Sequence, residues 1–219
     1  MIGVIVGMTS EARLVPDGCR VHCAGGRPAR ARALADQLLA GGAAGLISFG
    51  IAGGLDPALR PGALIIPDRV MTAVGTVEAD PEWRHRLRAL LPGALPGAIL
   101  GADDIAAPAE GKARLFHATG ALAVDLESAS VALACRDAGR PYAVIRTVAD
   151  PADRDLPSLV ADALTPDGRP QPMKVAAGLL RRPFELPALI AVGRDSGKAL
   201  SALRAAVGRL GPAFGLETA

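Results

Sequence analysis

The stretch Val124–Asp150, VDLESASVALACRDAGRPYAVIRTVAD, contains a strand, a helix and a second strand in close succession. A short apolar run, Ala121–Val124, leads directly into a predicted helix over Glu127–Ala138. Gly139 ends that helix, and the apolar run Tyr142–Ala149 predicts a buried strand. Strands that alternate with helices in this way are typical of α/β proteins.

The same alternation continues toward the N-terminus. Short apolar runs predict further strands at Ile2–Gly7, Cys19–Ala24, Gly45–Ile51, Ala63–Pro67, Arg69–Val74 and Ala98–Gly101. Apolar positions at helical spacing predict helices at Arg30–Leu39, Pro81–Leu91 and Ala109–Ala118. We therefore predict a single α/β domain with a mostly parallel central mixed sheet flanked by helices. From about Leu156 onward the sequence predicts helical structure, although prolines within Leu179–Ile190 interrupt any long helix.

Composition narrows the class of protein. Half of the 219 residues are hydrophobic and 21% are charged, which excludes an extended disordered chain. The 24 basic and 22 acidic residues nearly cancel, so we expect no nucleic-acid partner. Ile2–Met8 is too short for a signal peptide, and no apolar stretch approaches the ~20 residues of a membrane span. These features predict a cytoplasmic protein.

Cysteine and histidine usage argues against a metal site. The three cysteines, Cys19, Cys23 and Cys135, are odd in number and form no C-x-x-C pair. Cys19, Val21 and Cys23 alternate and so share one face of a predicted strand. The three histidines lack the spacing of metal ligands. We therefore expect no metal and no disulfide framework.

Acidic side chains follow successive predicted strands, where ligands bind in α/β sheets. These acids are Glu11, Asp103, Asp104, Asp125, Glu127 and Asp150. A dinucleotide site is not predicted, because the glycine after the first strand is not part of a G-x-G-x-x-G fingerprint. A phosphate-binding loop of the Walker type is also absent from the sequence.

Three segments together resemble the nucleoside phosphorylase and nucleosidase superfamily, which includes the methylthioadenosine/S-adenosylhomocysteine nucleosidases. They are Gly3–Glu11 (GVIVGMTSE), Ser48–Asp56 (SFGIAGGLD) and Val124–Asp150. The family pattern has a glutamate after the first strand, an S/T-x-G-x-A-G-G-L loop, V-E-M-E opening a helix and R-x-x-S-D after the next strand. The resemblance covers roughly residues 1–155. The polar segment Leu164–Met173, which three prolines break, separates the expected catalytic domain over residues 1–164 from a helical extension of the same domain over residues 165–219.

The resemblance also implies roles at the matching positions. Asp150 matches the acid that protonates or hydrogen-bonds N7 of the purine, and Glu127 matches the glutamate that holds the ribose hydroxyls. Glu11 matches the glutamate that activates water in the nucleosidases. The matching substrate loop consists of Gly50, Ile51, Ala52 and Gly53.

Bond-breaking chemistry supports these roles. Cleavage of a ribose–purine bond passes through an oxocarbenium-like state, which a carboxylate near the sugar stabilises. The departing purine is a poor anion unless an acid protonates N7. Four positions depart from the family pattern, with Asp125 in place of glutamate, Leu126 in place of methionine, and Ile51 and Ala149 in place of serine.

Each acid also has a plain structural explanation. Asp150 precedes Pro151 and suits a turn, while Glu127 and Glu11 suit the first turn of a helix. Because the three acids occur together and in the family's order, we favour the catalytic interpretation.

The nucleophile distinguishes two branches of this superfamily. Phosphate needs cationic donors, and Arg27, after Gly25–Gly26, and Arg13 are the candidates, although both also suit an ordinary helix surface. The segments GMTSEAR, SFGIAGGLDPALRPG and LLRRPFELPAL are similar to hopanoid-associated phosphorylases. This similarity implies phosphorolytic release of adenine from adenosylhopane, with inorganic phosphate as co-substrate and no metal or organic cofactor.

Other functions stay open. The alternatives are a hydrolytic methylthioadenosine/S-adenosylhomocysteine nucleosidase and a purine-binding module without turnover. The superfamily commonly forms homo-oligomers, so we expect one here.

The C-terminal segment adds a question about partners. Its apolar side chains are Leu179, Leu180, Phe184, Leu186, Leu189 and Ile190. With Arg181 and Arg182, these side chains would suit peripheral contact with the anionic head groups of a membrane. The alternative is that they pack onto the domain or across an oligomer interface.

Overall fold

The computed structural model describes residues 1–104, 108–160, 165, 167–211 and 214–216. The strands are β1 (Ile2–Val6), β2 (Arg20–Cys23), β3 (Gly45–Gly54), β4 (Leu64–Ile65), β5 (Arg69–Thr72), β6 (Gly75–Glu78), β7 (Ala98–Gly101), β8 (Ala123–Asp125) and β9 (Tyr142–Asp150). The helices are α1 (Thr9–Ala12), α2 (Pro28–Ala40), α3 (Pro81–Leu90), α4 (Ala109–Thr119), α5 (Ser128–Asp137), α6 (Pro172–Arg181) and α7 (Leu186–Leu210). Two short 3-10 turns, η1 (Ser158–Val160) and η2 (Pro183–Glu185), complete the described elements.

The described strands form one mixed sheet, as the alternation of elements predicts. Its order is β2-β1-β3-β8-β7-β5-β6, with β9 beside both β3 and β4. Parallel pairs predominate, and the antiparallel pairs are β3 with β8, β4 with β9 and β5 with β6. The long strand β3 therefore joins β1, β8 and β9, which carry the acids expected at strand ends.

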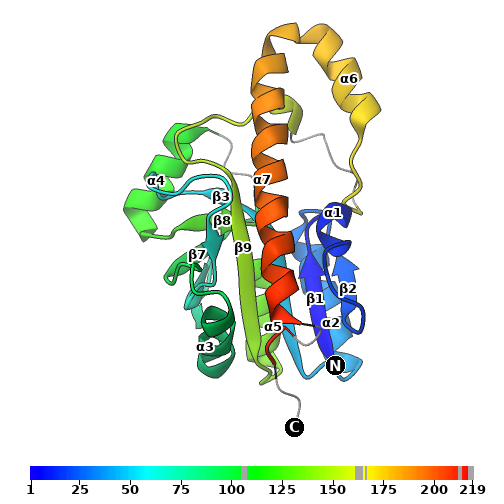
Figure 1. The fold of residues 1–219 in the computed structure, drawn as a ribbon, viewed down its shortest axis with the longest axis vertical. Coiled ribbons are helices and arrows are strands. Elements are labelled where there is room, and N and C mark those ends of the chain that lie inside the picture. The colour runs from blue at the N-terminus through cyan, green and yellow to red at the C-terminus, as the bar shows by residue number, and fades with distance from the viewer. Residues whose placement is uncertain (105–107, 161–164, 166, 212–213, 217–219) are drawn as a thin grey trace.

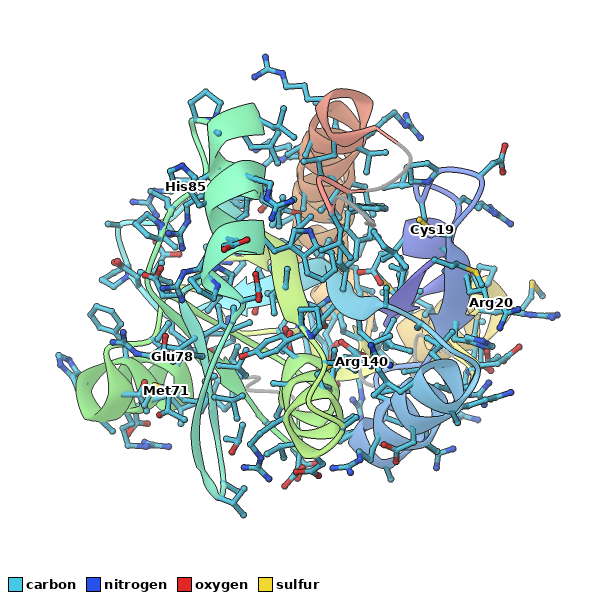
Figure 2. All side chains as sticks on the ribbon, turned by 90° about the horizontal axis from the view of Figure 1, so that it is seen from below. Cys19, Arg20, Met71, Glu78, His85 and Arg140 are labelled. Atoms are coloured by element: carbon cyan, nitrogen blue, oxygen red, sulfur yellow. The ribbon has the colours of Figure 1, made fainter. Side chains whose placement is uncertain are left out.

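Helices cover both faces of the sheet. Figure 2 shows α3 and α7 on one side of the strands and α2 and α5 on the other. One buried apolar cluster includes Ala31, Ala35 and Val131 from α2 and α5, and a second includes Trp83 and Leu203 from α3 and α7. This arrangement confirms the predicted single α/β domain, which buries the strands from both sides.

Trp83 of α3 has a packing role. Its side chain is fully buried, and its Nε1–H donates a hydrogen bond to Phe214 O at 2.7 Å. The tryptophan thereby joins α3 to the chain after α7.

Strand β3 is longer than the apolar pattern predicts. We expected a strand over Gly45–Ile51 followed by a loop, but β3 continues to Gly54. The continuation pairs with β9 as far as Asp150 and with β8 at Val124 and Ala123. Glycine-rich sequence therefore forms a strand here because neighbouring strands supply hydrogen-bond partners on both of its edges.

Two other strands are present but shorter than the apolar pattern predicts. The strand expected over Ala63–Pro67 shrinks to Leu64–Ile65, and the segment expected as one strand over Arg69–Val74 is the first half of the hairpin β5–β6. Thr72 and Gly75 close that hairpin through a hydrogen bond from Thr72 Oγ1 to Gly75 O. A turn of this kind carries little apolar signal of its own.

The C-terminal extension is helical, but its prolines do not prevent a long helix. Pro187 lies in the first turn of the 25-residue helix α7, where its missing N–H has no partner in any case. The later half of α7 packs on β9, and α6 with the first turns of α7 extends beyond the sheet (Figure 1). The predicted boundary at residue 164 lies outside the described residues. Among the described helices, none is long and apolar enough to span a membrane.

Candidate active site

The three acids predicted for catalysis all lie at the carboxyl ends of strands. Glu11 belongs to α1, directly after β1; Glu127 is the N-cap of α5, after β8; and Asp150 is the last residue of β9. All three side chains are buried. Strand β3 lies between these ends, and its segment Gly50–Gly53 is the predicted substrate loop in strand form.

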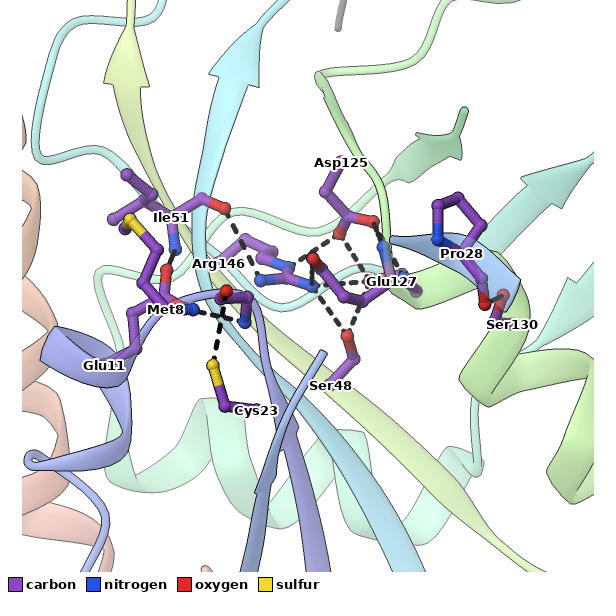
Figure 3. A network of polar contacts seen from close by, with 12 residues as sticks. Met8, Glu11, Cys23, Pro28, Ser48, Ile51, Asp125, Glu127, Ser130 and Arg146 are labelled. Carbon is purple, nitrogen blue, oxygen red and sulfur yellow. Dashed lines mark hydrogen bonds and ion pairs between the residues drawn. The ribbon is translucent and has the colours of Figure 1, made fainter. Parts of the chain in front are cut away.

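Glu11 is held by backbone donors from two strands. Its Oε2 accepts hydrogen bonds from the N–H groups of Gly7 and Met8, and its Oε1 accepts one from Ile51, all at 2.8 Å (Figure 3). Burial raises the pKa of Glu11, and the charge of Arg146 together with these donors opposes that rise. The side chain therefore fastens the end of β1 to β3 and keeps one acceptor position on Oε1.

Gly50 makes this close packing of charged groups fit. Its φ of 154° lies in a region that side chains rarely adopt. A Cβ at this position would lie 2.5 Å from both Arg146 Nη1 and Glu11 Oε1. The glycine of the substrate loop is therefore required by the groups next to it, whatever its contact with a substrate.

Arg146 is the main residue of this edge that sequence analysis missed. The guanidinium is fully buried in β9, and its Nε donates to Asp125 Oδ2 at 2.6 Å. Its Nη2 donates to Ser48 Oγ at 2.7 Å and to Glu127 Oε2 at 3.2 Å (Figure 3). An arginine within an otherwise apolar strand was the available signal, because such a charge is rarely buried without partners.

Asp125 shapes the start of α5. Its Oδ1 accepts the backbone N–H groups of Glu127 at 3.1 Å and Ser128 at 2.8 Å, and its Oδ2 accepts the Ser128 hydroxyl. A carboxylate in this position satisfies donors at the helix N-terminus that have no partner within the helix. Asp125 thus holds the backbone of Glu127 in place and also forms an ion pair with Arg146.

Glu127 lies in the most crowded electrostatic environment. A Cβ on Gly7 would lie 2.9 Å from Glu127 Oε1, so β1 also approaches this carboxyl closely. Burial raises the pKa of Glu127 to about 7, and the negative charges of Asp125 and Glu11 add to the effect against the lowering by Arg146. Glu127 thus changes charge near neutral pH.

Asp150 lies apart from this group and has its own cation. Lys112, on α4, is fully buried, and its Nζ lies 2.5 Å from Asp150 Oδ2. Burial raises the pKa of Asp150, while the Lys112 ammonium opposes the rise. A Cβ on Gly53 would lie 3.8 Å from Oδ2, which sets Asp150 against β3 three residues beyond Gly50. Sequence analysis missed Lys112, because nothing in the local pattern of its helix distinguishes a buried lysine from an exposed one.

The two arginines predicted for phosphate have exposed side chains. Arg13 follows α1, and Arg27 is the N-cap of α2 at the carboxyl end of β2. The preceding residues, Gly25 and Gly26, have φ values of 72° and 68°, a left-handed turn that suits glycine. A Cβ on Gly26 would lie 3.5 Å from Leu126 Cδ1, so this turn adjoins the start of α5. In the described part of the chain, no group of three acidic, histidine or cysteine side chains is placed to hold a metal ion.

Glu127 makes the stability of the protein depend on pH. Because its pKa rises from the ordinary 4.5 to about 7 on folding, the folded chain binds this proton more tightly. Its contribution to the free energy of unfolding is complete below about pH 4.5 and is lost as pH rises through about 7. We expect Glu127→Gln, which carries no titrating group, to lose that part of the pH dependence.

Urea unfolding at about pH 5 and about pH 7.5 measures the difference. Glu82→Gln, which removes an exposed acid on α3, is the matched control and should behave like the wild type. Identical pH dependence in the wild type and Glu127→Gln would contradict the raised pKa of Glu127.

Comparison with known proteins places this edge in context. Residues 4–182 match the Phosphorylase superfamily. Among solved structures, the methylthioadenosine/S-adenosylhomocysteine nucleosidase of Neisseria meningitidis, in complex with methylthio-immucillin-A, matches with a TM-score of 0.73 and 16% identity. The match covers 97% of this chain and 98% of the nucleosidase. No curated protein matches the chain.

Two further structures share the fold. The S-adenosylhomocysteine nucleosidase of Streptococcus pyogenes matches with a TM-score of 0.68 and 17% identity, over 95% of this chain and 96% of that protein. A futalosine hydrolase mutant of Helicobacter pylori matches with a TM-score of 0.63 and 18% identity, over 70% of this chain and 89% of that protein. The family match over most of the chain shows that the protein belongs to the phosphorylase superfamily, which confirms the predicted class of enzyme, one that cleaves N-glycosidic bonds of nucleosides.

Proposed function

We propose that the protein releases adenine from an adenine nucleoside by phosphorolysis, with inorganic phosphate as co-substrate. The observation that carries this proposal is the placement of two groups of buried acids along one strand, β3. Glu11 adjoins Gly50, Glu127 accepts a hydrogen bond from Arg146 beside it, and Asp150 adjoins Gly53 further along. Cleavage needs carboxylates where the ribose becomes positive and an acid where the purine departs.

The turn at Gly25–Gly26 supports phosphate as the nucleophile. It ends β2 and leads into the N-terminus of α2, where backbone N–H groups and the helix dipole favour an anion. Arg27 adds a cationic side chain at the same place, and Leu126 of the neighbouring segment connects the turn to Glu127. A phosphate bound there would lie beside the residue that we assign to the ribose.

Hydrolysis is the alternative mechanism, and one observation favours it. Burial raises the pKa of Glu11, as expected of a carboxylate that must accept a proton from water. The acceptor position that remains on Oε1 suits such a water molecule. In this alternative the enzyme is a methylthioadenosine/S-adenosylhomocysteine nucleosidase, and Arg27 lies on an ordinary surface.

Adenine release with and without phosphate separates these mechanisms. The substrates are adenosine, methylthioadenosine and adenosylhopane, each assayed in phosphate-free buffer and again after addition of phosphate. We expect release to depend on phosphate and to yield a ribose 1-phosphate product. Equal release in both buffers would replace phosphorolysis by hydrolysis, and no release from any of the three would favour a purine-binding module.

Asp150 should matter more for turnover than for binding. Because protonation of N7 stabilises the departing purine mainly in the transition state, we expect Asp150→Asn to lower kcat by roughly 100- to 10,000-fold with little change in KM. Steady-state kinetics measures both constants. Asp153→Asn changes an exposed acid three residues away and is the matched control. A near-normal kcat for Asp150→Asn would remove the residue from the role of acid.

We further propose that the substrate is adenosylhopane and that the protein contacts the membrane from which it comes. The apolar arm, defined here as residues 172–194 in α6, η2 and the first turns of α7, supports this proposal. Leu180, Phe184 and Ile190 are 87%, 77% and 62% exposed, so they do not pack onto their own domain. The exposed charges of the arm are mainly basic and come from Lys174, Arg181, Arg182 and Arg194. Exposed apolar groups with basic neighbours suit a surface of anionic lipid.

Sedimentation with vesicles of anionic lipid at low salt tests the apolar arm. We expect the wild type to sediment and Phe184→Asp and Arg181→Glu to stay in the supernatant. Val74→Asp changes a 71% exposed valine in the β5–β6 hairpin, outside the arm, and should sediment like the wild type.

A wild type that stays in the supernatant would exclude membrane contact. The exposed apolar surface would then belong to an interface in the homo-oligomer that we expect. In that case Phe184→Asp should lower the mass of the particle in light scattering.

A further inference from the structure

Lys112 is a fully buried lysine that the family pattern does not explain. It lies in the first turns of α4 and reaches the end of β9. Its ammonium donates hydrogen bonds to Pro151 O at 3.0 Å and Arg154 O at 2.7 Å, and forms an ion pair with Asp150 Oδ2 at 2.5 Å. Two backbone carbonyls and one carboxylate therefore surround the buried ammonium.

The position of Lys112 gives the two carboxyl oxygens of Asp150 different surroundings. Oδ2 forms the ion pair with the ammonium, whereas Oδ1 is buried and has no hydrogen bond among the described residues. A carboxyl oxygen that faces an ammonium is the poorer place for a proton, because proton and cation repel each other. A proton taken up by Asp150 therefore resides on Oδ1.

Two other charged residues near Asp150, Arg154 and Asp153, act on its pKa in opposite directions and form ion pairs of their own. Arg154 pairs with Asp195 of α7 at 2.6 Å, and Asp153 pairs with Arg60 at 3.2 Å. Lys112 is thus the cation in direct contact with Asp150. Its helix, α4, is also held near the end of β9 at its first residue, because the Ala109 N–H donates a hydrogen bond to Asp155 Oδ1. Burial by itself makes a carboxyl group hold its proton tightly and so raises the pKa of Asp150. The Lys112 ammonium lowers that pKa and opposes the effect of burial.

We propose that Lys112 is a positioning residue that makes Asp150 an effective acid, directing the proton to Oδ1 and stabilising the carboxylate that remains after the proton has gone. The proposal rests on the proposed function. In the step, the electron pair of the glycosidic bond passes to the purine, the proton moves from Asp150 Oδ1 to N7, and the nucleophile bonds to the sugar. Asp150 is left as an anion beside Lys112, which keeps its own protons throughout.

Variants at this position separate charge from structural support. Lys112→Gln keeps hydrogen-bond donors for the carbonyls of Pro151 and Arg154 but removes the cation, whereas Lys112→Arg keeps the cation. Lys198→Gln is the matched control, because it breaks another lysine–aspartate pair, with Asp195 at 3.1 Å. Lys112→Met serves as a second uncharged variant if Lys112→Gln does not fold.

The first measurement is the titration of the Asp150 carboxyl by ¹³C NMR in the free protein. Loss of the cation removes an influence that lowers the pKa of Asp150, so that pKa should rise in Lys112→Gln and stay near the wild-type value in Lys112→Arg and Lys198→Gln. Unchanged titration in both uncharged variants would overturn the proposal.

The second measurement is the pH profile of adenine release. Activity that needs protonated Asp150 falls as pH rises through the pKa of that group, so this limb should move to higher pH in Lys112→Gln. The weaker acid should also lower kcat on the order of 10- to 100-fold, with KM nearly unchanged. A lysine with a purely structural role would lower stability and leave the limb in place, which would contradict the proposal.

The two measurements fail separately. If the wild type releases no adenine from any nucleoside, the proposed function is wrong, and the NMR titration still decides whether Lys112 controls Asp150. If adenine is released but neither the titration nor the pH limb moves, the function stands and the role of Lys112 is wrong.

Discussion

The buried guanidinium of Arg146 is the interaction on which the candidate site depends. It joins β9 to Asp125 and Glu127 at the start of α5 and to Ser48 of β3. Removing one partner from a buried charge pair leaves the other without compensation, at a cost of about 3–5 kcal/mol. The relative positions of β3, β8 and β9 therefore depend on one side chain, and Gly50 is needed because that side chain leaves no space for a Cβ.

The charges around Arg146 do not balance, and this imbalance has a chemical use. One guanidinium faces three buried carboxyl groups, those of Glu11, Asp125 and Glu127. Burial is the largest cause of the rise in the pKa of Glu127 to about 7, and the negative charges of Asp125 and Glu11 add to it. Such an environment favours any positive charge that develops nearby, and an oxocarbenium-like sugar is a charge of this kind. These buried carboxyl groups would thus lower the barrier of the proposed reaction by stabilising the positive charge of the sugar.

In the proposed reaction, a second, separate pair would act on the other end of the nucleoside. Asp150 and Lys112 lie against Gly53, whereas Arg146 and Glu11 lie against Gly50 of the same strand. Because Asp150 pairs with Lys112 while Glu11 and Glu127 share Arg146, the two groups of acids can have different proton affinities within a short distance. The extension of β3 through Gly54 sets the spacing between the two, so the strand itself defines the length of the site.

The sequence alone determined the fold class, through local patterns of apolar residues. It also singled out the three acids, through the resemblance of their segments to the superfamily. Alternating apolar runs and helical periodicity predict α/β architecture, and Glu11, Glu127 and Asp150 each follow a strand at a recognisable position. Only the tertiary structure decided that Arg146 joins Asp125 and Glu127, and that Lys112 meets Asp150 from a helix 38 positions earlier in the chain. Pairing of strands likewise turned an expected loop into the end of β3. The physical reason is that a buried charge is tolerated through partners distant in sequence, and no local pattern records who those partners are.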